Sequence, residues 1–133
     1  MKLYYSPGAC SLSPHIVARE AGIAVDLKKV DLKTKTLAEG GSYTAINAKG
    51  YVPALGLDDG SLLTEGPAIG QYMADQNPDS GLAPKAGTLD RLRLQEWLNF
   101  ISSELHKAMG TFFNPKAPDD WKAAVTERLG VRM

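Results

Sequence analysis

Short runs of alternating apolar residues and longer periodic segments follow one another along the first 76 residues. Runs rich in β-branched and aromatic residues predict strands, whereas apolar residues at three- and four-residue spacings predict helices. The predicted strands cover residues 2–6, 24–32, 52–57 and 61–64. The predicted helical segments cover residues 13–22, 34–47 and 65–76, and the middle one is broken by loop. The order β-α-β-α-β-β-α predicts an α/β domain.

Cap and turn residues mark where several of these elements begin and end. Ser13 followed by Pro14 is typical of a helix start, because Ser caps the N-terminus and Pro suits the first helical position. Gly22 is placed to stop that helix. The Asp-Asp-Gly sequence at 58–60 predicts a hairpin turn, since Asp and Gly accept the positive φ angles of tight turns.

The remainder of the chain has only helical patterns. Residues 77–87 contain two prolines and two glycines, which favours a linker. Residues 88–113 carry an apolar stripe at helical spacing: Leu94, Leu98, Ile101, Leu105 and Met109. A second helix is predicted over 119–130, beginning at Asp119 or Asp120. We therefore predict an α/β domain over 1–77, a linker over 78–87 and a partial all-α domain over 88–133.

Charge and composition exclude several classes of protein. The chain has 15 basic and 15 acidic residues, whereas a nucleic-acid-binding protein usually has a basic surplus. It has no apolar run approaching the roughly 18 residues of a membrane span, and its N-terminus lacks the features of a secretory signal. A single cysteine cannot form an internal disulfide, so a reducing, cytoplasmic location is expected.

That cysteine, Cys10, lies between the first strand and the first helix. The dipole of a helix N-terminus favours an anion, and cysteines there can have a pKa lowered from about 8.5 to roughly 3.5–7.5. The Cys-x-x-Ser sequence also has the form of monothiol redox proteins. An inert cysteine that packs as a small apolar residue is the alternative, and both interpretations stay open on this motif alone.

Two further motifs surround the third and fourth predicted strands. In "YVPAL", Pro53 removes a hydrogen-bond donor at a strand start, where thioredoxin-like folds have a cis-proline that leaves the neighbouring backbone of Val52 free to pair with a peptide. An ordinary trans-proline in a loop is the alternative. In "LLTEGPAI", Thr64 is the expected cap of a helix whose first turn holds Glu65 and Gly66.

The second of these motifs has the chemistry of an amino-acid binding site. Amides at a helix start bind carboxylates, glycine permits close approach, and Glu65 is suited to an ammonium group. The alternative is a capped helix with an acidic first turn, which stabilises any helix. Downstream, Asn99, Ser103 and His106 are spaced to form one polar stripe on an apolar helix. A solvated face is the alternative there, and His15 is expected to be structural.

Taken together, "KLYYSPGACSLSPHI", "GYVPAL", "LLTEGPAI" and "EWLNFISSELHK" resemble the bacterial beta class of glutathione S-transferases. The resemblance runs from Met1 to about Arg132. It implies a thioredoxin-like N-terminal domain, a linker and a helical domain. It also implies a cytoplasmic, homodimeric detoxification enzyme that uses glutathione as co-substrate, without metal, to conjugate hydrophobic electrophiles such as halogenated aromatics.

The resemblance also assigns roles to particular residues. Cys10 is similar to a cysteine beside the glutathione sulfur, and His106 to a histidine near the same thiol. Val52, ahead of a cis-Pro53, would pair with the cysteinyl backbone. Residues that would contact the rest of glutathione are Lys35 at the glycyl carboxylate, Glu65 and Gly66 at the γ-glutamyl group, and Asn99, Ser103, Glu104 and Leu105, some of them across a dimer interface.

Family chains usually continue beyond the position of Met133, so the resemblance implies a shortened helical domain. Either the sequence is a fragment of a longer chain, or neighbouring residues and a dimer partner cover the face that further helices would cover. We expect exposed apolar surface on residues 89–113. An electrophile pocket would draw on Tyr5, Phe112, Phe113 and Trp121. Two other functions remain open: a glutaredoxin-like oxidoreductase that forms a Cys10–glutathione mixed disulfide, and a non-catalytic glutathione-binding protein.

Overall fold

A five-stranded mixed sheet organises the first part of the chain in the computed structural model, which describes residues 1–132. Its strands are β1 (Lys2–Tyr5), β2 (Asp26–Asp31), β3 (Thr36–Leu37), β4 (Ala54–Gly56) and β5 (Leu62–Thr64), in the spatial order β3-β2-β1-β4-β5. β1 pairs in parallel with β2 and antiparallel with β4, while the β2–β3 and β4–β5 pairs are antiparallel. Helix α1 (Leu12–Glu20) makes the crossover that a parallel β1–β2 pair requires.

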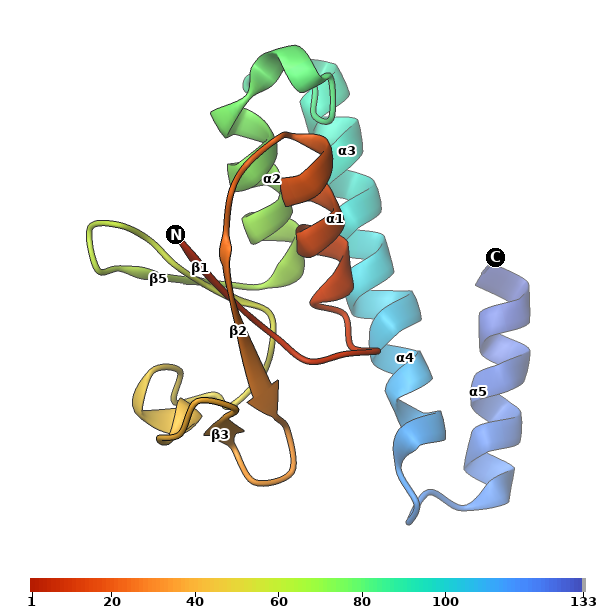
Figure 1. Cartoon of the computed structure of the whole chain (residues 1–133). Coiled ribbons are helices and arrows are strands. Elements are labelled where there is room, and N and C mark those ends of the chain that lie inside the picture. Colours follow the sequence, from red (N-terminus) through yellow and green to blue (C-terminus); the bar gives the residue numbers. More distant parts are fainter. Residues whose placement is uncertain (133) are drawn as a thin grey trace. The chain divides into compact units, whose positions relative to one another are not determined.

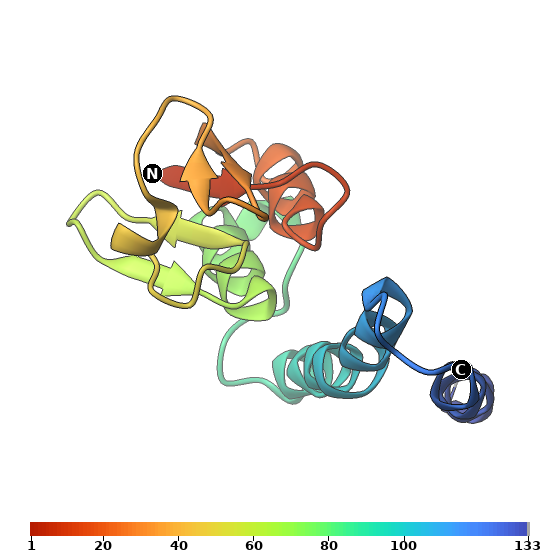
Figure 2. The ribbon, with the colours of Figure 1, turned by 90° about the horizontal axis from the view of Figure 1, so that it is seen from below.

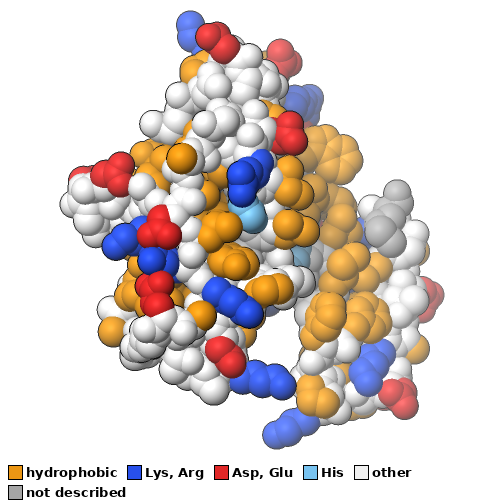
Figure 3. All heavy atoms as spheres, viewed as in Figure 1, with side chains coloured by type: hydrophobic (Ala, Val, Ile, Leu, Met, Phe, Trp, Pro, Cys, Tyr) orange, Lys and Arg blue, Asp and Glu red, His pale blue; other side chains and the backbone are white. Residues whose placement is uncertain are grey.

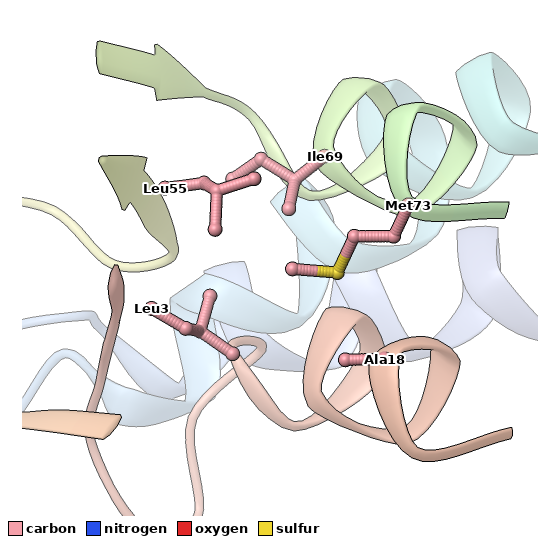
Figure 4. Packing of buried hydrophobic residues seen from close by; sticks show 5 residues of the cluster. All are labelled: Leu3, Ala18, Leu55, Ile69 and Met73. Carbon is pink, nitrogen blue, oxygen red and sulfur yellow. The ribbon is translucent and has the colours of Figure 1, made fainter. Parts of the chain in front are cut away.

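Helices α1 and α2 (Gly66–Gln76) pack side by side on one face of this sheet (Figures 1 and 2). The buried side chains between helices and strands, shown in Figure 4, are Leu3, Ala18, Leu55, Ile69 and Met73. Because side chains alternate along a strand, Tyr4 and Ala54 belong to a second cluster, with Tyr43. Both faces of β1 are covered, as its central position in the sheet requires.

The helical pieces and loop predicted at 34–47 are correct only for one short helical turn. The chain there forms the two-residue strand β3 and a 3₁₀ turn at Tyr43–Ala45. Gly40 and Gly41 have φ angles of 97° and 95°, which no right-handed helix accommodates. The observed order in this half is therefore β-α-β-β-β-β-α.

Two predicted helix starts are also corrected. α1 begins at Leu12 rather than after Ser13, and the side chain of the preceding Ser11 bonds to Ser6 instead of capping the helix. α2 begins after Glu65, so Thr64 belongs to β5 and is not the cap. Gly22 has a φ of 69° just beyond the end of α1, which confirms its predicted role as a stop.

By internal contacts the chain divides into two compact units, Met1–Ala86 and a second from Gly87 onward. The predicted domain and linker boundaries at 77, 78–87 and 88 remain predictions. Asn77 is bound to the first unit, because its Nδ2 donates to the carbonyl of Ala21 at 3.0 Å. A 3₁₀ turn, Pro78–Ser80, follows it.

The second unit is helical throughout most of its length. Helix α3 (Leu89–Phe100) is capped by Thr88, whose Oγ1 accepts from the Arg91 N–H. It continues through a π-helical segment, Ile101–His106, into the short α4 (Lys107–Met109) and a 3₁₀ turn, Gly110–Phe113. Helix α5 (Asp119–Arg132) confirms the second predicted helix. α5 lies beside α4 in both views, where Ala108, Val125 and Leu129 form a small buried cluster (Figures 1 and 2).

Apolar side chains of the second unit are exposed, as predicted for residues 89–113. Leu89 is 67% exposed, Trp97 62% and Phe113 86%. Figure 3 shows hydrophobic side chains of this unit at the molecular surface. Within residues 1–132, no helix is both long enough and apolar enough to cross a membrane.

Candidate functional site

The loop between β1 and α1 holds Cys10 at the surface of the first unit. Ser11, 1% exposed, closes this loop: its Oγ accepts from the Ser6 N–H at 3.1 Å and donates to the Ser6 carbonyl at 3.2 Å. Cys10 itself is exposed. Its Sγ lies 3.3 Å from the carbonyl oxygen of Val52, to which the thiol donates. The cysteine thus joins the start of α1 to the segment that precedes β4.

That segment is held in place by buried polar groups. The Val52–Pro53 peptide bond is cis. The carbonyl of the neighbouring Tyr51 accepts two hydrogen bonds, one from the Tyr43 hydroxyl at 2.7 Å and one from Asn47 Nδ2 at 2.9 Å. Tyr43 is fully buried and Asn47 is 5% exposed. These supports fix the backbone on one side of Val52.

The environment of Cys10 favours the neutral thiol. Desolvation of the sulfur by the surrounding protein raises the pKa of Cys10 above its ordinary value, although the residue as a whole is exposed. Hydrogen bonding to the backbone N–H groups of Cys10 and Ser11 opposes this rise, and the negative charge of Glu65 adds to it. The lowered pKa expected from a helix start is therefore wrong in direction, because desolvation outweighs the favourable amides.

The start of α2 lies against the same segment. A Cβ built on Gly66 would lie 3.8 Å from Cγ of Pro53, and Glu65 acts electrostatically on Cys10. Glu65 occupies the left-handed region, with a φ of 72°. Its side chain caps no helix amide and instead pairs with Lys49, with 3.4 Å between Oε1 and Nζ. The helix start thus leaves the Glu65 carboxylate facing outward, with 73% of the side chain exposed.

Lys35 contacts Gly50 and Tyr51, which precede Val52 in the chain. Its Nζ donates to the Gly50 carbonyl at 2.9 Å and lies 5.7 Å from the centre of the Tyr51 ring. Its backbone has a φ of 57° and accepts a hydrogen bond from the Tyr43 N–H at 2.8 Å. The first unit therefore brings together the sequence-predicted residues Cys10, Lys35, Val52, Pro53, Glu65 and Gly66.

The remaining predicted site residues lie in the second unit. Asn99 is at the exposed side of α3, and Ser103 Oγ donates back to its carbonyl at 2.9 Å. Glu104 pairs with Arg132 at 2.7 Å, and Leu105 packs against the small buried cluster. His106 is exposed.

The polar stripe predicted for this helix assumed α-helical spacing. Ser103 and His106 lie in the π-helical segment, whose i→i+5 turns are wider. The i, i+4, i+7 rule therefore does not carry over from Asn99 to His106, although all three side chains are exposed. No pattern of residue types in this segment signals the change of helix.

Other candidate residues have different surroundings. His15 is partly buried beside Tyr5, with 6.3 Å between ring centres, which agrees with a structural role. Of the residues expected to line an electrophile pocket, Phe112 is 43% and Trp121 50% exposed.

A cavity of about 640 Å³ in the first unit is lined by residues such as Tyr4, Ile46, Leu57 and Asp58. None of the predicted site residues borders this cavity. Among residues 1–132, no group of three or more His, Cys, Asp or Glu side chains is arranged to hold a metal ion.

Sequence reasoning missed the residues that support the site. Ser11, Tyr43 and Asn47 are buried polar residues whose side chains each bond to a backbone carbonyl. Lys49 is an exposed lysine in a turn. One signal was present in the sequence. Asn47, two residues before Lys49, has the spacing of an Asx turn, and its Oδ1 does accept the Lys49 N–H.

Comparison with known proteins identifies the class to which this arrangement belongs. Residues 8–76 match the family model "Glutathione S-transferase, N-terminal domain". The chain belongs to the glutathione S-transferase family, and its fold is the thioredoxin-like sheet followed by helices that the resemblance implied.

Bacterial relatives share both sequence and structure with the chain. It is 50% identical to glutathione S-transferase GstA of Escherichia coli O157:H7, over 97% of this chain and 64% of that protein. The solved structure of BphK, a bacterial glutathione S-transferase in a ternary complex, is 60% identical with a TM-score of 0.97, covering 99% of this chain and 66% of that one. A sphingomonad glutathione S-transferase complexed with glutathione is 51% identical with a TM-score of 0.95, again covering 99% and 66%.

The likeness extends to a structure described as bacterial beta class. This glutathione S-transferase of Sphingomonas chungbukensis is 50% identical with a TM-score of 0.94. The resemblance to that class is confirmed. The chain spans 64 to 66% of the length of these relatives.

Proposed function

We propose that the protein is a glutathione transferase, which joins the thiolate of glutathione to an electrophilic carbon of a hydrophobic small molecule. The observation that carries the proposal is the group formed by Cys10, Val52, Pro53, Glu65 and Gly66 in a unit that belongs to this family. A backbone segment beside a thiol, a helix start and a carboxylate suit a short peptide with an amino-acid head group.

Each part of glutathione has a proposed partner in the first unit. The γ-glutamyl group would bind at Glu65 and Gly66, with its ammonium at the Glu65 carboxylate. The cysteinyl backbone would pair with Val52, which would direct the sulfur toward Cys10. The glycyl carboxylate would take the Lys35 ammonium from its present acceptor, the Gly50 carbonyl.

The proposed reaction is a nucleophilic substitution. Glutathione loses its thiol proton, the sulfur forms a bond to the electrophilic carbon, and the bond from that carbon to a leaving group such as chloride breaks. Hydrogen-bond donors near the sulfur stabilise the thiolate and increase its population at neutral pH. His106 is proposed to act near the sulfur, and Asn99, Ser103, Glu104 and Leu105 are proposed to complete the glutathione site.

Glutathione binding and conjugation test the proposal together. We expect an excess of reduced glutathione to raise the Tm of the chain, because a ligand specific for the folded state stabilises it. We also expect conjugation of a chlorinated nitroaromatic, followed by absorbance. Absence of any Tm shift would contradict glutathione binding, while a shift without product would favour a non-catalytic glutathione-binding protein.

A second activity, thiol–disulfide exchange, is favoured by the position of Cys10, which is an exposed residue with a free thiol. The Cys10 thiolate would attack the glutathione sulfur of a mixed disulfide and release the substrate thiolate. A second glutathione thiolate would then attack the Cys10–glutathione disulfide, giving glutathione disulfide and free Cys10. Substituting Cys10→Ala should abolish this exchange and leave conjugation measurable, whereas loss of both activities would make the cysteine essential for conjugation as well.

We further propose a homodimeric, cytoplasmic protein with a role in detoxification. The exposed apolar side chains of the second unit, among them Leu89 and Trp97, support an interface between copies. Sedimentation equilibrium at increasing concentration tests this, and a monomer at all concentrations would contradict it.

A further inference from the structure

Lys49 lies in a tight turn that is bound to the candidate site. The backbone N–H of Lys49 donates to Asn47 Oδ1 at 3.2 Å, and the Gly50 N–H donates to the Asn47 carbonyl at 2.8 Å. The same Asn47 side chain holds the Tyr51 carbonyl next to Val52. Because Asn47 is 5% exposed, the turn that bears Lys49 and the backbone at Val52 are positioned by one buried residue.

The side chain of Lys49 reaches the start of α2. Its Nζ lies 3.4 Å from Glu65 Oε1 and 3.4 Å from Thr64 Oγ1. The Lys49 side chain is 58% exposed and that of Glu65 is 73% exposed. The ion pair is thus accessible from solvent, so a ligand can contact both charges without first opening the fold.

The pair matches one chemical class of ligand head group. A cation and an anion side by side complement a zwitterion that carries an ammonium and a carboxylate on one carbon. An ammonium without a carboxylate would compete with Lys49 for Glu65 and leave the lysine unpaired. A head group with both charges replaces the Lys49–Glu65 ion pair with two ion pairs, one to each side chain. Lys49 therefore favours ligands that carry the carboxylate.

We propose that Lys49 determines specificity for the γ-glutamyl head group by binding its α-carboxylate beside the ammonium held by Glu65. This inference rests on the proposed function, since it names a further residue of the same glutathione site. In the free protein, the Lys49 ammonium pairs with the Glu65 carboxylate. When glutathione binds, the Lys49 ammonium would pair with the α-carboxylate of the ligand instead.

Calorimetric titration with two peptides tests the role of Lys49. One peptide is reduced glutathione. The other is its 4-aminobutyryl analogue, which lacks only the α-carboxylate and keeps the ammonium. The variants are Lys49→Met, which removes the charge, and Lys49→Arg, which keeps it. Lys28→Met is the control, because Lys28 also forms ion pairs, with Asp26 and Glu39, and none of these three residues belongs to the candidate site.

We expect Lys49→Met to weaken glutathione binding about threefold to tenfold, the range for a solvent-exposed charge pair or slightly above it. The same substitution should leave the affinity for the analogue unchanged or slightly improved. Lys49→Arg should retain discrimination between the peptides, and Lys28→Met should change neither affinity. Unaltered thermal unfolding of each variant verifies that the fold is intact.

An equal loss of affinity for both peptides in Lys49→Met would overturn the inference. Tighter glutathione binding by Lys49→Met would overturn it as well, because it would show that Lys49 only competes with the ligand ammonium. In either case, binding of glutathione by the unchanged chain would leave the proposed function standing. Failure of the unchanged chain to bind glutathione would overturn the proposed function and this inference with it.

Discussion

The two units of the chain differ in how they cover their apolar side chains. In the first unit Leu3, Leu55, Ile69 and Met73 have no exposed surface, and two helices close one face of the sheet. Among the described residues of the second unit, 87–132, Ala108, Val125 and Leu129 form a small buried cluster, while Leu89, Trp97 and Phe113 are each more than 60% exposed. The first unit therefore has a well-buried apolar core, whereas the helices of the second unit gain less from burial.

The same difference appears in the candidate site residues. Those of the first unit are held by buried groups, such as Ser11 at the Cys10 loop and Tyr43 beneath Tyr51. Those of the second unit rest on exposed contacts, such as the Glu104–Arg132 pair. We therefore expect the glutathione-binding function of this chain to depend mainly on the first unit.

The largest difference in stability loss between the two units should come from replacing a leucine in each with alanine. Leu55→Ala removes a fully buried side chain and should lower the free energy of unfolding by about 2–5 kcal/mol. Leu89→Ala, at a position that is 67% exposed, should change it by less than about 0.5 kcal/mol. Urea unfolding of both variants makes the comparison, and similar losses would contradict the contrast between the units.

Removal of a buried loop hydroxyl should have the next largest effect. Ser11→Ala deletes both hydrogen bonds to Ser6 and should cost about 1–3 kcal/mol, because the partly buried Ser6 N–H loses its acceptor. The Ser6 carbonyl keeps the Ala9 N–H as a donor at 3.2 Å. Ser13→Ala, two residues away on the exposed side, is the matched control and should be nearly neutral. If Ser13→Ala were the more destabilising variant, Ser13 would be the helix cap after all.

The pKa of Cys10 gives a chemical test of the first unit. Iodoacetamide reacts with the thiolate, so its rate against pH should have a midpoint above that of a free cysteine, because desolvation raises the pKa of Cys10. Glu65→Gln should lower that midpoint, since it removes a nearby negative charge. Cys10 is the chain's single cysteine, so the signal is unambiguous, and Glu39→Gln serves as control. A midpoint below that of free cysteine would show that the helix start dominates.

A small effect on stability is expected at the ion pair of the second unit. Arg132→Ala breaks the 2.7 Å contact with Glu104, in which the Arg132 side chain is 45% exposed and that of Glu104 33% exposed. The free energy of unfolding should fall by less than about 1 kcal/mol, because solvent screens such pairs. A loss as large as that from Leu55→Ala would mean that this contact, rather than burial, stabilises the second unit.

Much of the fold follows from local patterns. Short apolar runs and the Asp-Asp-Gly turn locate four of the strands, and the acidic residues at 119–120 locate the start of α5. The two-residue β3 was missed, because Thr36 and Leu37 have no periodicity to detect and are defined only by pairing with β2. The π-helical segment was missed for a similar reason, since its residues satisfy an α-helical pattern equally well.

The site residues that are recognisable by their chemical type could be predicted from the sequence. The residues that hold them in place through hydrogen bonds could not. Cys10, Pro53 and Glu65 are conspicuous as residues next to predicted element boundaries. The pKa of Cys10 was not predictable, because the tertiary fold sets the desolvation of the sulfur and brings the charge of Glu65, which is distant in sequence, close to it. Asn47 and Tyr43 resemble ordinary loop residues until their hydrogen bonds to Tyr51 are seen.

The most direct test of the central claim is a titration of the ¹⁵N-labelled chain with reduced glutathione, followed by amide chemical shifts. We predict that the largest changes occur at Cys10, Val52, Glu65 and Gly66, the residues that the first unit brings together. Absence of shift changes, or changes confined to the borders of the 640 Å³ cavity such as Gly56 and Asp58, would contradict the account.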